Sequence, residues 1–197
     1  LLGTIMNLPL SEALKKHSRQ THDSVDMLVL SMEPFASIEN YSKFLQAQNA
    51  FHEVLKPIYE NPSLNLKIKG LNSLSRLEQV AMDMQDLHVK TMLVDEAIPS
   101  PSEFESIGWL YCSEGSNLGA AILYKEAQKI ELTSTHGAKH LSAHKDGRMV
   151  HWRKFKEQLD GLELTLTQRQ QALKGAEDAF AFFKRVIRQV NYAEETV

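Results

Sequence analysis

Two glycines four residues apart, Gly115 and Gly119, lie in a stretch that otherwise has a helical pattern. A glycine inside a helix costs about 1 kcal/mol relative to alanine, so a pair on one helical face needs a compensating use. This spacing leaves a strip of backbone without side chains, against which a flat or bulky group can lie. Close helix packing or a tolerated bend is the alternative interpretation.

His22 is a second position whose residue type could support chemistry. It lies in a predicted helix, with apolar Val25 and Val29 on the turns that follow. Asp26 stands four residues further on, where its carboxylate can bond one ring nitrogen and leave the other for a metal. A neutral, oriented imidazole on a rigid element is what a haem iron needs from an axial ligand. A histidine whose ring is satisfied structurally is the alternative.

The other histidines and the single cysteine give weaker signals. His136, His140 and His144 have the spacing HxxxHxxxH, but Gly137 weakens a helix there and no nearby cysteine completes a zinc set. Surface histidines are therefore the favoured interpretation. Cys112 lies among apolar residues, which favours a buried thiol over a nucleophile, and one cysteine excludes an intrachain disulfide.

Composition excludes several classes of function. With 197 residues, a net charge of -3 and a pI near 6.3, the chain has no basic footprint for nucleic acid or an anionic membrane. No apolar run has the length of a membrane span. The start, LLGTIMNLPL, lacks the features of a signal peptide, and Met6 is a candidate natural start. A cytoplasmic protein is expected, with residues 1–9 as an N-terminal tail and 10–197 as one domain.

The elements that position these residues are all predicted to be helices, because apolar residues recur at intervals of three and four. Ser11 and Ser37 are expected to cap the first two helices, and Ser102 with Glu105 forms a capping box before the glycines. The expected helices cover about residues 11–30, 37–59, 73–88, 102–126, 149–171 and 174–192. Since no strand alternation is visible, the prediction is an all-α, single-domain bundle.

Three segments together resemble the bacterial, biliverdin-forming haem oxygenases. They read THDSVDMLVLSMEPFAS (21–37), GWLYCSEGSNLGAAILYK (108–125) and HGAKHL (136–141), and weaker similarity covers about residues 10–190. The resemblance implies a helical bundle with haem between the first, proximal helix and a distal helix kinked at its glycines. It also implies that haem b is both cofactor and substrate, and that O₂ and supplied electrons cleave it to biliverdin, Fe²⁺ and CO.

The resemblance assigns roles by position. The axial ligand of the haem iron falls on His22, and the catalytic distal face on Gly115, Ser116 and Gly119. Ser116 or Asn117 would hold the ordered water that delivers protons. The positions expected to bind haem, by a propionate, an aromatic wall or packing, are Lys15, His22, Val25, Tyr111, Asn117, Phe180 and Phe183.

The orientation of the haem decides which carbon is attacked. Some bacterial relatives rotate the haem by anchoring its propionates on extra lysines, and those positions align here with Leu30 and Glu126, neither of them basic. The resemblance therefore implies cleavage at the α-meso carbon to biliverdin IXα, with iron acquisition from haem as the purpose.

Electrons must come from another protein, because the chain has no GxGxxG fingerprint for a nucleotide cofactor. A flavin reductase or ferredoxin is the expected donor to a monomeric enzyme. The basic segment 139–156 could dock an acidic donor, and an ordinary solvated basic face is the alternative. Two other functions stay open, namely a haem-trafficking protein without turnover and a thiaminase-like hydrolase of the same fold that uses Cys112 as its nucleophile.

Overall fold

The computed structural model describes residues 2–5 and 7–192, and within these ranges the regular elements are all helical, as predicted. Met6, the candidate natural start, lies outside the described residues. The four long helices are α2 (Leu10–Ser31), α3 (Ile38–Tyr59), α6 (Glu103–Lys129) and α8 (Leu166–Tyr192). The shorter ones are α1 (Leu2–Ile5), α4 (Pro62–Lys67), α5 (Leu77–Asp86), α7 (Arg148–Asp160) and the 3₁₀ turns η1 (Leu71–Leu74) and η2 (Lys139–Leu141).

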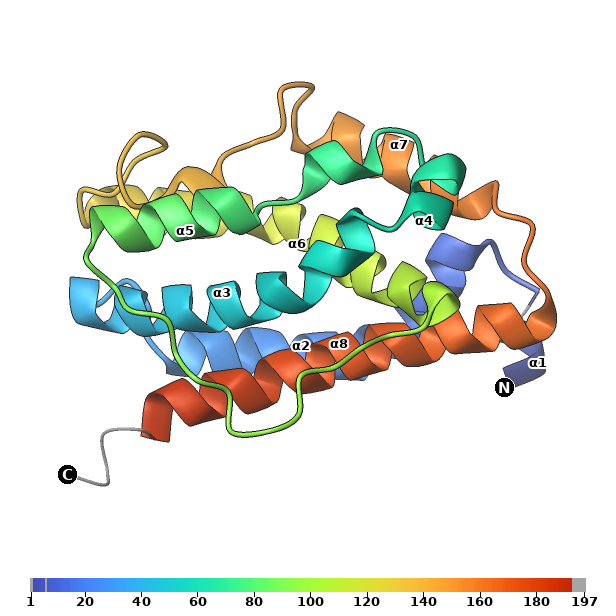
Figure 1. Ribbon diagram of the computed structural model, residues 1–197, viewed down its shortest axis with the longest axis horizontal. Helices are drawn as coiled ribbons and strands as arrows, with labels where there is room; N and C mark the ends of the chain where they lie inside the picture. The colour runs from blue at the N-terminus through green and yellow to red at the C-terminus, as the bar shows by residue number, and fades with distance from the viewer. Residues whose placement is uncertain (1, 6, 193–197) are drawn as a thin grey trace.

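Helix α8 organises the bundle, because α2, α3 and α6 all pack against it. In Figure 1, α2 and α8 run side by side along one edge, and α3 lies between this layer and α5. The connection between α5 and α6 crosses the outside of α8, where Gln189 bonds the backbone of Leu93 at 2.6 Å and of Asp95 at 3.1 Å. No helix in the described residues combines the length and hydropathy needed to span a membrane.

Two glycines that differ from the distal pair bring α6 and α8 into backbone contact. A Cβ atom on Gly108 would lie 2.1 Å from the carbonyl oxygen of Ala172, and one on Gly175 would lie 1.9 Å from that of Glu105. Neither position has room for a side chain, so α6 is fixed to α8 near its N-terminal end. The distal glycines lie further along the same helix.

Two of the predicted caps are confirmed and one is wrong. Ser37 accepts a hydrogen bond from the amide of Asn40 at 3.0 Å, and Ser102 with Glu105 forms the expected capping box. Ser11 does not cap α2, which begins at Leu10. Instead the Ser11 amide and hydroxyl donate to the carboxylate of Asp160, at 2.8 and 2.9 Å. A carboxylate from the end of α7 thus supplies the acceptor that a local cap would otherwise provide.

The predicted break between the last two helices is also wrong. Helix α7 ends at Asp160 and α8 runs without interruption from Leu166, so Gly175 is interior to a helix. The Thr165 hydroxyl accepts from the amide of Gln168 at 3.2 Å at the true start of α8. The prediction placed the break at residues 172–173, whereas this stretch is inside α8 and Gly175 contacts α6 there. The predicted helix over 73–88 is likewise shorter, because η1 precedes α5.

The N-terminal residues described are packed rather than isolated. Ile5 and Leu8 lie against the hydrophobic core, and the guanidinium of Arg169 donates to the carbonyl of Leu8. The domain boundary at residue 10 stays a prediction.

Candidate active site

His22 lies on α2 with its side chain 53% exposed. Its Nδ1 atom is 3.5 Å from a carboxylate oxygen of Asp26 and 3.7 Å from one of Asp23. Both acids therefore face the same ring nitrogen, which leaves Nε2 as the atom that can bind iron. Phe180 of α8 stands edge-on to the imidazole, with ring centroids 5.6 Å apart, and limits its rotation.

The predicted haem-binding residues on α2 share the face of His22. Lys15 is seven residues earlier, close to two helical turns, so its exposed ammonium extends from the same side. Val25, one turn after His22, is 6% exposed and joins the core side of this face. The face therefore combines the predicted iron ligand, an apolar surface and a cation that could pair with a carboxylate.

The glycine face of α6 is partly open. A Cβ atom on Gly119 would meet nothing within 4 Å, whereas one on Gly115 would lie 3.2 Å from the Cη2 atom of Trp152. Ser116, between them, is exposed and donates its hydroxyl to the carbonyl of Ser113 at 2.6 Å. Bare backbone bordered by an indole is suited to receive a flat macrocycle. Helix α6 is continuous from Glu103 to Lys129, and the kink at its glycines stays a prediction.

The aromatic residues predicted for the pocket lie at its borders. Tyr111 contacts Trp152, with ring centroids 5.4 Å apart, and partial burial raises the pKa of its phenol to about 12. Phe183 packs on Phe51, with ring centroids 5.3 Å apart, and like Phe180 is partly buried. Of the two phenylalanines predicted on α8, Phe180 is thus the one the structure brings to His22.

Asn117 is not brought onto the glycine face. It is buried, and its side-chain amide donates to Glu114 at 3.2 Å. Because it is two residues from Gly119, it points about 200° away around the helix. The expected contact of this side chain with haem or its water therefore does not follow from the structure. Asn117 instead belongs to a polar cluster on the opposite face of α6.

This buried polar cluster centres on Glu114, which is 2% exposed. One carboxylate oxygen accepts from the Tyr59 hydroxyl at 2.7 Å, and the other lies 2.7 Å from Nε2 of His151. Burial and the carboxylate raise the pKa of Tyr59 well above its usual range, so it donates. The His151 ring stacks on that of His144, with centroids 4.2 Å apart.

A second buried carboxylate, Asp83, holds η2 in place. It accepts from the amides of Lys139 and His140 at 2.8 and 2.9 Å, and the His140 Nδ1 atom lies 2.7 Å from it. His136, His140 and His144 do not share a helical face, because only His140 lies in η2 and each contacts a different acid. The aligned metal-site geometry that their spacing suggested is therefore absent from these three residues.

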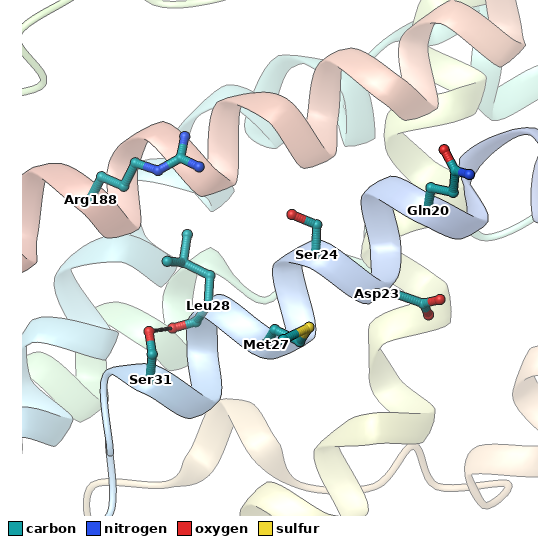
Figure 2. Close-up of a pocket in the computed structure, with 7 residues that line it drawn as sticks. All are labelled: Gln20, Asp23, Ser24, Met27, Leu28, Ser31 and Arg188. Atoms are coloured by element: carbon teal, nitrogen blue, oxygen red, sulfur yellow. Dashed lines mark hydrogen bonds between the residues drawn. The ribbon is translucent and has the colours of Figure 1, made fainter.

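A groove lies elsewhere on α2. Its volume is about 490 Å³, and Figure 2 shows α2 residues including Ser24 and Ser31 on one side and Arg188 of α8 on the other. Ser24 is two residues from His22, about 200° around the helix. The groove thus lies mostly on the side of α2 away from His22, with Asp23 at its border, and differs from the predicted haem site.

Comparison with known proteins decides the family. A family model described as Heme oxygenase matches residues 8–189, nearly the whole chain. The chain belongs to the haem oxygenase family.

Individual haem oxygenases agree with this assignment. The chain is 39% identical to Heme oxygenase PigA of Pseudomonas aeruginosa over 175 residues, 88% of each protein. It is 33% identical over 101 residues to a heme oxygenase of Xanthomonas campestris, covering 50% of this chain and 61% of that protein. Among solved structures, the NO- and CO-bound heme oxygenase of Neisseria meningitidis superposes with a TM-score of 0.90 and 45% identity, covering 93% of this chain and 92% of that one.

A more distant solved structure shows the fold alone. The heme oxygenase of Leptospira interrogans, at 16% identity, has a TM-score of 0.74 and covers 92% of this chain and 100% of that one. The all-α architecture and the haem oxygenase activity predicted from the sequence are therefore both confirmed.

Cys112 has no role as a nucleophile in this haem oxygenase. The thiol is buried, lies 3.5 Å from the carbonyl of Ala176, and has its pKa raised well above its usual range by burial. A reactive cysteine needs the opposite, a lowered pKa and exposure. The thiaminase-like alternative loses its only candidate nucleophile.

Sequence reasoning missed the part of the haem oxygenase site supplied by α7. Trp152, His151 and Arg148 all contact the distal segment of α6, more than thirty residues away in sequence. Nothing local in the sequence identifies these partners, because the contact depends on how the chain turns through η2. Gly108 gives no signal for α7, because its missing side chain admits the backbone of α8.

Proposed function

We propose that this haem oxygenase cleaves haem b at the α-meso carbon to give biliverdin IXα, Fe²⁺ and CO, using O₂ and electrons from an external flavin reductase or ferredoxin. The observation that carries the proposal is the pair of faces described above. His22 presents Nε2 from α2, and Gly119 of α6 presents backbone with open space around it. Haem supplies the iron at which O₂ is reduced and also the carbon that is oxidised.

The residues around His22 suit this chemistry. Asp26 and Asp23 are mostly exposed and stand 3.5 and 3.7 Å from Nδ1, longer than a strong hydrogen bond. They orient the imidazole without fully removing its proton. A neutral imidazole pushes less electron density toward the opposite ligand than a thiolate does, and this favours oxygenation of the ring over early cleavage of the O–O bond.

The glycine face positions oxygen. Without side chains at Gly115 and Gly119, the backbone of α6 can approach the iron closely and direct bound O₂ toward the edge of the macrocycle. The exposed hydroxyl of Ser116 is the polar group on this face that can hold an ordered water for proton delivery.

The charges around the site support α-selectivity. Lys15 extends from the His22 face, where it can bind a propionate. Leu30, by contrast, is 73% exposed and apolar, and Glu126 is an acid paired with Lys129 at 2.7 Å. The two positions that would anchor a rotated haem therefore offer no cation.

The electron donor is proposed to be a separate protein, and several cations of the basic segment 139–156 already have partners within the molecule. Lys139 pairs with Asp86, Lys154 lies 3.5 Å from Asp146, and Arg148 is engaged with backbone carbonyls. The ordinary interpretation of this segment is thus better supported than donor docking. We further propose a monomer in the cytoplasm that releases iron from haem, a setting that suits the single reduced cysteine.

The test is a turnover experiment with product analysis. Ferric haem is added to the purified protein, and a reductase or ascorbate is supplied with catalase present. We expect a Soret band that decays to biliverdin, with the IXα isomer dominant. A variant carrying Leu30→Lys and Glu126→Lys is the matched comparison and should shift product to other isomers. A stable Soret band would support haem trafficking, and a dominant β or δ isomer from the wild type would refute α-selectivity.

A further inference from the structure

One face of α7 contacts the distal segment of α6 residue by residue. Arg148, His151 and Trp152 have the i, i+3, i+4 spacing of a single helical face. Arg148 donates to the carbonyl of Asn117 at 2.9 Å, and His151 lies 2.7 Å from the Glu114 carboxylate. The Trp152 ring lies against Gly115, as described above. This α7 face (Arg148, His151 and Trp152) therefore supports the glycine segment from the side away from open space.

The contact made by Arg148 is unusual because its acceptor is inside a helix. In an α-helix the carbonyl of Asn117 is the partner of the amide four residues on, at Ala121. A guanidinium that shares this oxygen draws it outward, and helices bend where carbonyls tilt away from the axis. Asn117 stands midway between Gly115 and Gly119, where the absence of side chains makes the backbone most compliant.

The position of Arg148 also carries costs that its contacts must offset. It is the first residue of α7, a helix with no acidic residue in its first turn and no side-chain cap. A cation there opposes the helix dipole. Partial burial and nearby Arg76 lower the pKa of the guanidinium, as expected for a cation moved out of water beside another cation. Its remaining contact, to the carbonyl of Leu141, links α6 to η2.

We propose that Arg148 is a positioning residue of this haem oxygenase. Through the carbonyl of Asn117 it sets how far the Gly115–Gly119 backbone stands from the haem, and so which meso carbon the bound oxygen reaches. Arg148 itself touches neither haem nor O₂. The inference rests on the proposed site, with haem between His22 and the glycine face.

Arg148→Lys tests this role, because lysine keeps the charge but cannot bond two carbonyls as the forked guanidinium does. We expect haem affinity within about threefold of wild type, and turnover roughly tenfold or more slower, since a misplacement of about 1 Å can cost a hundredfold. We also expect the product to change from one dominant isomer to a mixture. Hydrogen exchange should change at the Ala121 amide, which shares the carbonyl that Arg148 binds.

Two variants make the result specific. Arg153→Lys alters an exposed arginine of the same helix, paired with Glu157, and should leave product and rate unchanged. Arg76→Lys alters an arginine that donates to the carbonyl of His140 in η2 and to that of Ser142 directly after it, rather than to a carbonyl of α6. An isomer mixture in Arg148→Lys alone supports the proposal. The same mixture in Arg76→Lys would place the effect in η2 and overturn it.

If Arg148→Lys folds poorly, Arg148→Ala supplied with free guanidinium provides a second measurement. Recovery of the isomer ratio with guanidinium, but not with an equal concentration of ammonium, supports the proposal. A wild-type ratio in Arg148→Ala without any addition overturns it. The proposed α-selectivity is tested separately: it fails if the wild-type protein gives a product other than biliverdin IXα, whatever the variants show.

Discussion

At Gly119, the effect of a glycine on helix stability can be measured apart from its effect on haem turnover. A Cβ atom there meets nothing in the protein, so Gly119→Ala should stabilise the haem-free fold by up to about 1 kcal/mol, because alanine favours a helix. The added methyl group would instead occupy the space proposed for haem and O₂. We therefore expect a higher midpoint of urea unfolding together with slower haem turnover, and Gly119→Leu should exaggerate the loss of turnover.

Urea unfolding of the haem-free protein and single-turnover kinetics measure the two effects. Gly119→Leu with wild-type kinetics would show that this glycine has no part in the site. The pair of measurements is informative because stability and activity are expected to move in opposite directions, which a purely structural glycine would not produce.

At the scale of elements, a glycine-to-alanine substitution is expected to destabilise the fold instead, where α6 crosses α8. Gly175→Ala places a methyl group 1.9 Å from the carbonyl oxygen of Glu105, which neither helix can avoid without separating. Overpacking of this kind costs about 1–3 kcal/mol and occasionally more, and a clash with backbone belongs at the upper end. Denaturant unfolding should show a loss of roughly 3 kcal/mol, with Gly119→Ala as the matched control. Equal stability of the two variants would contradict the close backbone contact between α6 and α8 at Gly175.

How far the sequence predicts this structure depends on whether a signal is local. The caps at Ser37 and Ser102 were predicted because each bonds an amide three residues away in its own chain segment. The cap at Ser11 was wrong because its partner is Asp160, 149 residues later. The break between the last two helices was misplaced for the same reason, since the contact of Gly175 with Glu105 involves a residue far away in sequence.

The residues of the candidate site likewise divide into those that local sequence predicts and those that depend on distant contacts. The helical spacing places Lys15 and His22 on one face, and the family resemblance assigned their roles. Asn117 was expected to bind haem or hold an ordered water, although a helix turns its side chain about 200° from Gly119. The α7 face is beyond sequence reasoning, because no pattern in either helix shows that the two meet.

The stability of the whole molecule should depend on pH through His52. This histidine is fully inside the bundle, and burial, with nearby His140 and Arg76, lowers its pKa from 6.5 to about 3. Between these values the unfolded chain binds a proton that the native protein does not, so the free energy of unfolding falls as the pH falls. From about pH 7 to about pH 5 the loss attributable to this group is about 2 kcal/mol.

His52→Gln provides the comparison, because glutamine has no proton to bind in this range. Urea unfolding at the two pH values should show a smaller loss of stability in the variant than in the wild type. The other titrating groups are present in both proteins and cancel in the difference. An identical loss in both would show that His52 does not contribute to acid sensitivity.

The central claim is that His22 binds the haem iron opposite the glycine face, and absorption spectra of His22→Ala with ferric haem test it most directly. We predict an altered Soret band and no turnover, with the wild-type band restored by added imidazole. His17→Ala is the control, since His17 lies on the same helix and pairs instead with Glu177 at 3.1 Å. An unchanged Soret band and wild-type turnover in His22→Ala would contradict the account.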